Sequence, residues 1–178
     1  GLMPDIARLA PTHDLSAFAS RRPALDEWLR RHALQAMASN SATTYVCLDD
    51  GETVGFVSLA SAGIVPSDMD ARLRKGVSAY VPAPAQLIAR LATSARHEGR
   101  GIGTLLMLHA MRTVLQVNAL SAVRALVVNP IDDEAARFYA KFDFETLPGV
   151  APPMMYLLTK DVAALVRHHD DEARSAGR

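Results

Sequence analysis

The sequence predicts an α/β protein, a mixed sheet with helices on its faces. Two long segments show helical spacing of apolar residues, and several short segments show strand patterning between turn residues. The expected order is helix, two hairpin strands, a third strand, a glycine loop, helix, strand, helix, strand, which is not the strict alternation of a doubly wound fold. With 178 residues, the chain is close to one ordinary domain with a single well-buried core.

We therefore expect one domain over residues 1–178, with a polar tail, 169–178, that frays. A short strand is expected at Ile6–Leu9 and a helix at Pro23–Ala38, where Pro23 suits the first turn. The segments "TTYVCL" and "TVGFVSLA" read as strands, and "DDGE" between them is a hairpin signal.

The second half begins with a long irregular connection from Ala62 to Pro84, which contains the basic run "RLRK". "AQLIARLATSA" is the next expected strand, and Gly103–Val117 is a helix apolar on most of its circumference. "SAVRALVVN" has the apolar pattern of a central strand. Asp132 or Asp133 can cap the helix "EAARFYAKF", and the strand "MMYLLT" and the short helix "DVAALVRHH" follow.

Composition excludes some classes of protein. Lys and Arg balance Asp and Glu at a formal net charge of zero, so binding to nucleic acid would require a local basic patch. The single cysteine, Cys47, excludes an intramolecular disulfide and a multi-cysteine metal site, and we expect no metal and a cytoplasmic protein. Cys47 lies in an apolar run, where a buried small hydrophobe is the expected role. No apolar stretch approaches the ~20 residues of a membrane span.

The stretch "RHEGRGIGTLL" places three glycines directly before a good helix. The first amides of a helix lack intrahelical partners, and with the helix dipole they form an anion site. Glycine lets those amides approach a phosphate closely, and Arg100 adds a positive charge. Gly99–Thr104 is therefore suited to a pyrophosphate, although a glycine-rich turn that binds nothing is the alternative. The Walker and dinucleotide patterns both fit poorly.

The segment "EGRGIG" resembles the acetyl-CoA loop of GNAT-family N-acetyltransferases, in which Gln or Arg precedes two residues, Gly, one residue and Gly or Ala. Gly101 and Gly103 fall on the two small positions. Glu98 stands where Gln or Arg is usual, and we expect its side chain to point away or to bind backbone amides.

A second segment, "VVNPIDDEAARFYAKFDF", resembles the GNAT pattern Asn-x-x-Ala-x-x-x-Tyr-x-x-x-Gly-Phe. Ala135, Tyr139 and Phe144 match this pattern, whereas Asp132 replaces the asparagine and Asp143 replaces the glycine. Two motifs at the family spacing are much stronger evidence than either alone.

The resemblance implies a GNAT fold, with a mostly antiparallel sheet that splays between two central strands near Leu91 and Val127 and holds acetyl-CoA there. The thioester carbonyl would meet backbone amides near Ala92 or Thr93. Tyr139 would act as the general acid for the departing thiolate; edging an apolar core is its alternative role. The implied cofactor-binding residues are Leu91, Ala92, Thr93, Gly99, Arg100, Gly101, Ile102, Gly103, Thr104 and Asn129.

No residue is singled out as a general base. His32 and His109 lie in predicted helices and are expected to be structural histidines. His97 flanks the glycine loop, where it either touches a cofactor phosphate or is a solvated loop residue.

The stretch from "HDLSAF" through "LDEWLR" to the hairpin resembles GNAT toxins of bacterial toxin–antitoxin pairs. This resemblance implies acetylation of the α-amine of aminoacyl-tRNA, a ribbon-helix-helix antitoxin as partner, and Arg90 as a substrate-binding residue. A homodimer is left open. A local patch for tRNA phosphates could draw on Arg21, Arg22, Arg30, Arg31, Arg72, Arg74, Lys75 and Arg90, and solvated surface charges are the alternative.

Two other functions stay open at this point. One is a GNAT enzyme that acetylates a small-molecule amine or a protein amine. The other is a CoA-binding interaction module without catalysis.

Overall fold

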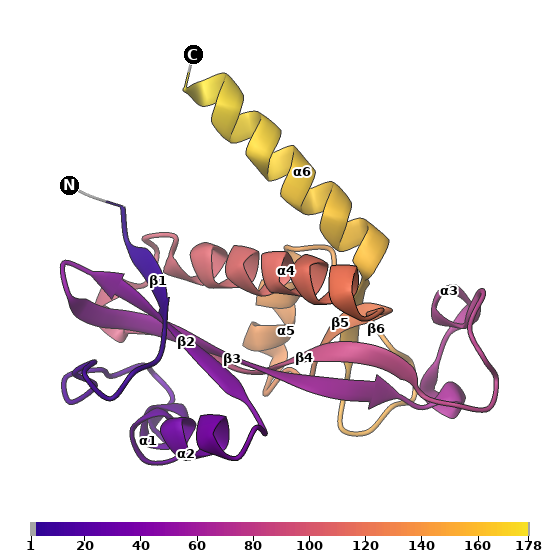
Figure 1. The fold of residues 1–178 in the computed structure, drawn as a ribbon, viewed down its shortest axis with the longest axis horizontal. Coiled ribbons are helices and arrows are strands. Elements are labelled where there is room, and N and C mark those ends of the chain that lie inside the picture. The colour runs from indigo at the N-terminus through magenta and orange to yellow at the C-terminus, as the bar shows by residue number, and fades with distance from the viewer. Residues whose placement is uncertain (1–2, 178) are drawn as a thin grey trace. The chain divides into compact units, whose positions relative to one another are not determined.

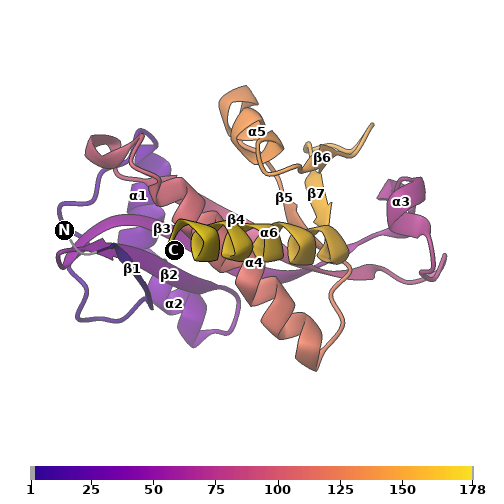
Figure 2. The ribbon, with the colours of Figure 1, turned by 90° about the horizontal axis from the view of Figure 1, so that it is seen from above.

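The computed structural model describes residues 3–177 and forms a seven-stranded sheet in the order β1-β2-β3-β4-β5-β7-β6 (Figures 1 and 2). The strand pairs β1–β2, β2–β3, β5–β7 and β6–β7 are antiparallel. This mostly antiparallel mixed α/β sheet confirms the predicted fold class. The chain divides into two compact units: the chain up to Ala60 with Ile88–Ala110, and Ser61–Leu87 with the chain from Met111 onward.

The first unit has helices on both faces of its strands. It contains β1 (Asp5–Arg8), β2 (Thr43–Asp49), most of β3 (Glu52–Ile64), the end of β4 (Ala83–Thr93), α1 (Pro23–Arg31), α2 (Ala33–Ala38), the 3₁₀ turn η2 (Ala95–His97) and the start of α4 (Ile102–Leu120). The β2–β3 hairpin turns at Asp50 (φ +52°) and Gly51 (φ +79°), the two positive φ values that a tight hairpin favours.

Side chains on β2 and β3 alternate between the two faces, as strand geometry requires. Val46 and Phe56 pair across the hairpin and belong to the core under α1 and α2, together with Phe18 and Leu29. Side chains at the alternate positions of these strands point to the opposite face, toward α4. Tyr45 on β2 is one of them: its ring lies 4.2 Å from that of His109 on α4. The predicted burial of Cys47 is confirmed: the side chain is fully buried, and burial raises its thiol pKa to about 11.

The prediction of a single helix over Pro23–Ala38 is wrong in one respect. It breaks at His32, whose backbone (φ −122°, ψ −18°) ends α1 and begins α2. Leu29 on α1 and Ala33 on α2 are both buried in the same core. Apolar spacing did not predict the break, because the spacing continues across it.

The second unit contains the remaining elements. These are the ends of β3 and α4, the start of β4, η1 (Pro66–Asp68), α3 (Ala71–Arg74), β5 (Ala125–Val128), α5 (Asp133–Ala140), β6 (Glu145–Thr146), β7 (Met155–Leu158) and α6 (Thr159–Ala176). Its core gathers Ile64, Leu73, Val127, Tyr156 and Leu158. The connection predicted as irregular from Ala62 to Pro84 is therefore shorter and carries two short helical turns.

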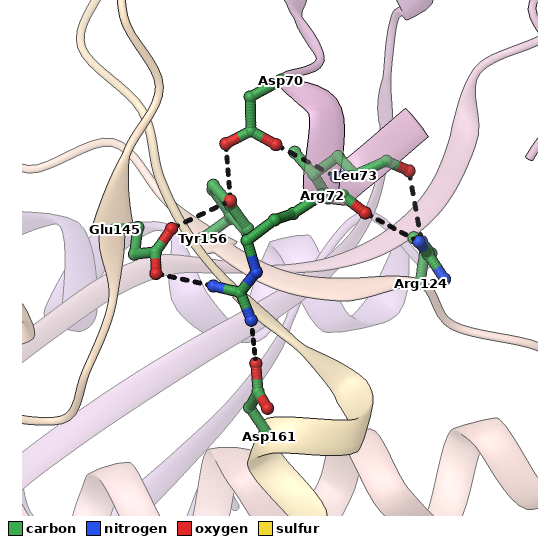
Figure 3. A network of polar contacts seen from close by, with 7 residues as sticks. All are labelled: Asp70, Arg72, Leu73, Arg124, Glu145, Tyr156 and Asp161. Atoms are coloured by element: carbon green, nitrogen blue, oxygen red, sulfur yellow. Dashed lines mark hydrogen bonds and ion pairs between the residues drawn. The ribbon is translucent and has the colours of Figure 1, made fainter. Parts of the chain in front are cut away.

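A polar network fixes this connection to the C-terminal strands (Figure 3). The buried Tyr156 hydroxyl donates to Asp70 Oδ2 at 2.5 Å and lies 3.1 Å from Glu145 Oε2. Burial, followed by these hydrogen bonds, raises the pKa of Tyr156 well above its usual value. Arg72 donates to Glu145 at 2.6 Å and to Asp161 at 2.8 Å. Arg124 donates to backbone carbonyls at the end of α3.

Helix α6 continues to Ala176, so the prediction of a short final helix is corrected, whereas the fraying expected of residues 169–178 stays a prediction. Ion pairs hold its last turns: Arg112 on α4 contacts Asp170 at 2.7 Å, and Arg174 contacts Asp171 at 2.6 Å. Polar composition alone suggested fraying, but it did not show these pairs. Within residues 3–177, no helix is long and apolar enough to cross a membrane.

Candidate acetyl-CoA site

The glycine loop connects the end of β4 to the start of α4 within the first unit. Strand β4 ends at Thr93, η2 follows, and α4 begins at Ile102. Gly99 (φ +77°) and Gly101 (φ +81°) adopt the left-handed conformation that glycine accepts without strain. A Cβ built at either glycine would meet no atom within 4 Å, so the backbone here borders open space.

The first turn of α4 has the geometry of an anion site. The Leu105 N–H donates to the Gly101 carbonyl at 3.1 Å, and the amides of residues 102–104 precede that first helical bond. Arg100 is exposed beside them. A pyrophosphate needs positive helix-end amides, a nearby cation and open space, and the loop provides all three. The residues of the loop therefore fit acetyl-CoA.

Gly55 on β3 determines how closely α4 approaches the sheet. A Cβ at Gly55 would lie 2.8 Å from Ile102 Cγ2, 3.0 Å from Leu106 Cδ1 and 3.2 Å from the Ala92 carbonyl oxygen. Only glycine leaves room for the first turn of α4 at this position. The role of Gly55 was not predicted, because a glycine within a strand indicates a close approach but not the element that makes it.

Glu98 is bound by an arginine from outside the loop. Arg21 Nε donates to Glu98 Oε1 at 2.8 Å, and a second Arg21 nitrogen donates to Oε2 at 2.7 Å. These hydrogen bonds hold the pKa of Glu98 below its usual value. The prediction for Glu98 was a side chain that points away or binds backbone amides. Its carboxylate is instead bound by the side chain of Arg21, a residue predicted only as a candidate for tRNA.

His97 is not a solvated loop residue. Its side chain is buried, and its Nδ1 lies 3.1 Å from Ser94 Oγ. Of the two alternatives for His97, the solvated loop histidine is therefore wrong.

The other residues of this unit that were predicted to bind cofactor or substrate lie together at the end of β4. Ala92 is buried, and Leu91 and Thr93 are partly exposed. Arg90 lies over Trp28, with its guanidinium carbon 3.9 Å from the ring centroid. Desolvation lowers the Arg90 pKa, but a guanidinium stays charged.

Tyr139 belongs to the second unit, where the end of α5 fixes its position. The Phe144 N–H donates to the Tyr139 carbonyl at 3.4 Å, and the Asp143 N–H donates to the Ala140 carbonyl at 3.0 Å. This pair of bonds, with Asp143 at φ +68°, is a Schellman motif. The rings of Tyr139 and Phe144 lie 5.6 Å apart, the apolar contact that accompanies the motif.

The second sequence motif thus has a physical basis in the ends of α5. Asp132 Oδ1 accepts the Ala135 N–H at 2.9 Å and caps the start of the helix, as predicted. Asp143 has a left-handed backbone conformation, which glycine adopts without strain. This explains why the family pattern has glycine at this position. Asn129, predicted to bind the cofactor, donates its side-chain amide to the Pro153 carbonyl at 3.0 Å.

The model of the Acetyltransferase (GNAT) family matches residues 9–144, which include both motifs. The chain belongs to this family. It is also 35% identical over 159 residues to a "tRNA-acetylating toxin" of Mycobacterium tuberculosis (strain ATCC 25618 / H37Rv), a match that covers 89% of this chain and 94% of the relative. The predicted family and N-acetyltransferase class are confirmed.

Two solved structures show the same fold. One is AtaT complexed with acetyl-methionyl-tRNAfMet, with a TM-score of 0.84 and 21% identity, covering 92% of this chain and 99% of that chain. The other is a mutant AtaT toxin bound to the C-terminus of the antitoxin AtaR and acetyl-CoA, with a TM-score of 0.78 and 22% identity, covering 92% of this chain and 97% of that chain.

Proposed function

We propose that this GNAT protein is a toxin that transfers the acetyl group of acetyl-CoA to the α-amine of aminoacyl-tRNA and so blocks translation. The observation that carries the proposal is the 35% identity to a tRNA-acetylating toxin along 89% of the chain. Because that match extends over nearly the whole of both proteins, it covers the helices before the hairpin as well as the acetyl-CoA loop. The AtaT complex with acetyl-methionyl-tRNAfMet supports the same acceptor.

The cofactor supplies a thioester whose acetyl group a neutral amine can attack. The loop residues Gly99–Thr104 would hold the pyrophosphate through backbone amides, which border open space, and Arg100 would add charge. The end of β4 at Leu91–Thr93 offers backbone amides to the carbonyl, and Asn129 is a further proposed contact. The main contribution of these groups is to orient the two reactants.

We assign the general-acid step to Tyr139. Its hydroxyl would donate a proton to the departing sulfur, a step typically worth 10²–10⁴ in rate. The Schellman motif at Asp143 and the packing against Phe144 fix the backbone from which this side chain projects. Replacing Tyr139 with Phe keeps the ring, so cofactor binding should survive while turnover falls by at least tenfold.

The acceptor amine needs no strong base. An α-amine has a pKa of about 7.7–8.0, so a useful fraction is neutral at cell pH. Arg90 is the proposed contact to the acceptor. Of the other basic residues suggested for tRNA, Arg21, Arg31 and Arg72 are engaged by carboxylates, whereas Arg74 and Lys75 are exposed at the end of α3.

A ribbon-helix-helix antitoxin is the proposed protein partner, supported by the AtaT toxin bound to its antitoxin. A cytoplasmic location follows from the proposed substrate, because charged tRNA is found there. A homodimer is compatible with the proposal and is not required by it.

The test incubates the protein with labelled acetyl-CoA and total charged tRNA. Label should precipitate with RNA, and mild alkaline hydrolysis should release it as N-acetyl amino acid. Uncharged tRNA should stay unlabelled, and Tyr139→Phe should reduce labelling at least tenfold while a thermal melt still shows stabilisation by acetyl-CoA. Label on free amines or protein, with none on charged tRNA, would assign the enzyme to small-molecule or protein amines.

A further inference from the structure

Glu98 is an unfavourable residue beside an anion-binding loop. It directly precedes Gly99, and the loop amides and Arg100 that follow are suited to a pyrophosphate. A free carboxylate there would repel the phosphates and would compete for the same amides. The chain must therefore neutralise Glu98 or direct it elsewhere for the loop to bind its ligand.

Arg21 does both. Its guanidinium forms a two-bond pair with Glu98, at 2.8 and 2.7 Å, which occupies both carboxylate oxygens. This arrangement matches the planar fork of arginine to the planar carboxylate and fixes direction as well as charge. Both side chains are partly exposed, at 63% and 37%, so ordered geometry rather than burial distinguishes the pair.

The segment that carries Arg21 is itself anchored. The Ala95 N–H in η2 donates to the Ala19 carbonyl at 2.8 Å, which joins this segment to the chain just before Glu98. Ser20 donates its N–H and its hydroxyl to the buried Asp26 on α1, at 3.0 and 2.6 Å. The two residues directly before Arg21 are thus anchored, Ala19 to η2 and Ser20 to α1.

We infer that Arg21 is a positioning residue for the cofactor, which neutralises Glu98 and holds its carboxylate away from the loop amides. This inference rests on the proposed function only in taking coenzyme A as the ligand of the loop. It assigns Arg21 a role separate from tRNA binding. Its effect on the ligand is exerted through Glu98, so the effect of removing Arg21 depends on the charge at residue 98.

The experiment measures binding of coenzyme A and of pantetheine, which lacks the pyrophosphate, by calorimetry on four proteins. These are the wild type, Arg21→Ala, Glu98→Gln and the double variant. Arg21→Ala should weaken coenzyme A binding about tenfold and leave pantetheine binding within twofold. Glu98→Gln should stay within threefold of wild type. The double variant should recover to within threefold, because no carboxylate remains to be neutralised.

Three results would overturn the inference. Arg21→Ala could bind coenzyme A as wild type does, or the double variant could stay as weak as Arg21→Ala, which would make Arg21 a direct ligand or a purely structural residue. Equal losses for coenzyme A and pantetheine would also contradict a role at the pyrophosphate. Because no acceptor is used, a wild type that binds coenzyme A but does not acetylate tRNA refutes only the proposed function.

Discussion

The guanidinium of Arg90 lies over the indole of Trp28, with its central carbon 3.9 Å from the ring centroid, and Trp28 in turn stacks on Phe56 at 6.4 Å. The contact joins α1 to the end of β4, and it fixes a cation that would otherwise be mobile. Stacking of this kind contributes about 0.5–2 kcal/mol. The direction of the Arg90 side chain therefore depends on a residue of α1.

Replacing Trp28 with Leu should reduce acetyl transfer to charged tRNA about as much as Arg90→Ala does, because both changes remove the oriented cation. Trp28→Phe keeps an aromatic face and should retain most of the transfer. Initial rates with charged tRNA, alongside coenzyme A binding to correct for folding, provide the measurement. If Trp28→Leu transfers normally while Arg90→Ala does not, the stacking has no part in positioning Arg90.

Gly55→Ala should both destabilise the protein and weaken coenzyme A binding. The new Cβ would lie 2.8 Å from Ile102 and 3.2 Å from the Ala92 backbone oxygen, so the start of α4 must shift away from β3. Overpacking of this kind typically costs about 1–3 kcal/mol. Gly177→Ala, where the nearest atom is 3.5 Å away, is the matched control. Denaturant midpoints equal to wild type for Gly55→Ala would mean that α4 accommodates the methyl group without loss.

Asp143→Gly should stabilise the protein by about 0.5–1 kcal/mol. Asp143 has φ +68°, a conformation that costs energy for every residue except glycine, although aspartate tolerates it better than most. Asp143→Ala should destabilise, because alanine keeps the Cβ and loses the polar side chain. Urea unfolding measures the change in the free energy of unfolding for each variant. The two changes should have opposite signs if backbone conformation controls this position, and the same sign if it does not.

Features that are determined by residues close together in the sequence were predicted better than features that depend on distant residues. The β2–β3 hairpin, the glycine loop and the Asp132 cap follow from residues close together in the chain, and all three were predicted. The break at His32 was not predictable, because apolar spacing passes through it unchanged.

The site shows the same division. Gly99 and Gly101 were recognisable because their role is in their own backbone. The partner of Glu98 was not, because Arg21 is 77 residues away and nothing local relates the two. The close approach at Gly55 and the contact of Trp28 with Arg90 were not predicted for the same reason: each depends on a residue that packs against it from elsewhere in the chain. The roles of Tyr139, Asn129 and Arg90 stay predictions.

Stability should fall as the solution is acidified from pH 7 to 5, partly because of His109. Burial lowers the pKa of this half-buried ring, which packs against Tyr45. Below about pH 6.5 the unfolded chain takes up a proton that the folded ring resists, so unfolding is favoured. The difference in unfolding free energy between wild type and His109→Leu should therefore shift in favour of the variant, with a limiting slope of about 1.4 kcal/mol per pH unit. A difference that is constant over this range would show that His109 does not titrate differently on unfolding.

Arg72 and Lys75 lie three residues apart in the basic run but should have different roles. Arg72 bridges Glu145 and Asp161 and takes part in the network around Tyr156, so its charge is already used within the protein (Figure 3). Arg72→Ala should lower the melting temperature, because Glu145 and Asp161 lose their cation, and should leave the salt dependence of tRNA binding unchanged.

Lys75→Ala should show the reverse pattern, since this exposed side chain at the end of α3 can reach phosphate. Its melting temperature should match wild type, and the slope of log affinity for charged tRNA against log salt should become shallower by about one unit for each phosphate that the lysine neutralises. Filter binding at several salt concentrations measures the slope. The opposite result is a shallower slope for Arg72→Ala and an unchanged slope for Lys75→Ala. It would place the RNA-binding surface at the network around Tyr156 rather than at the end of α3.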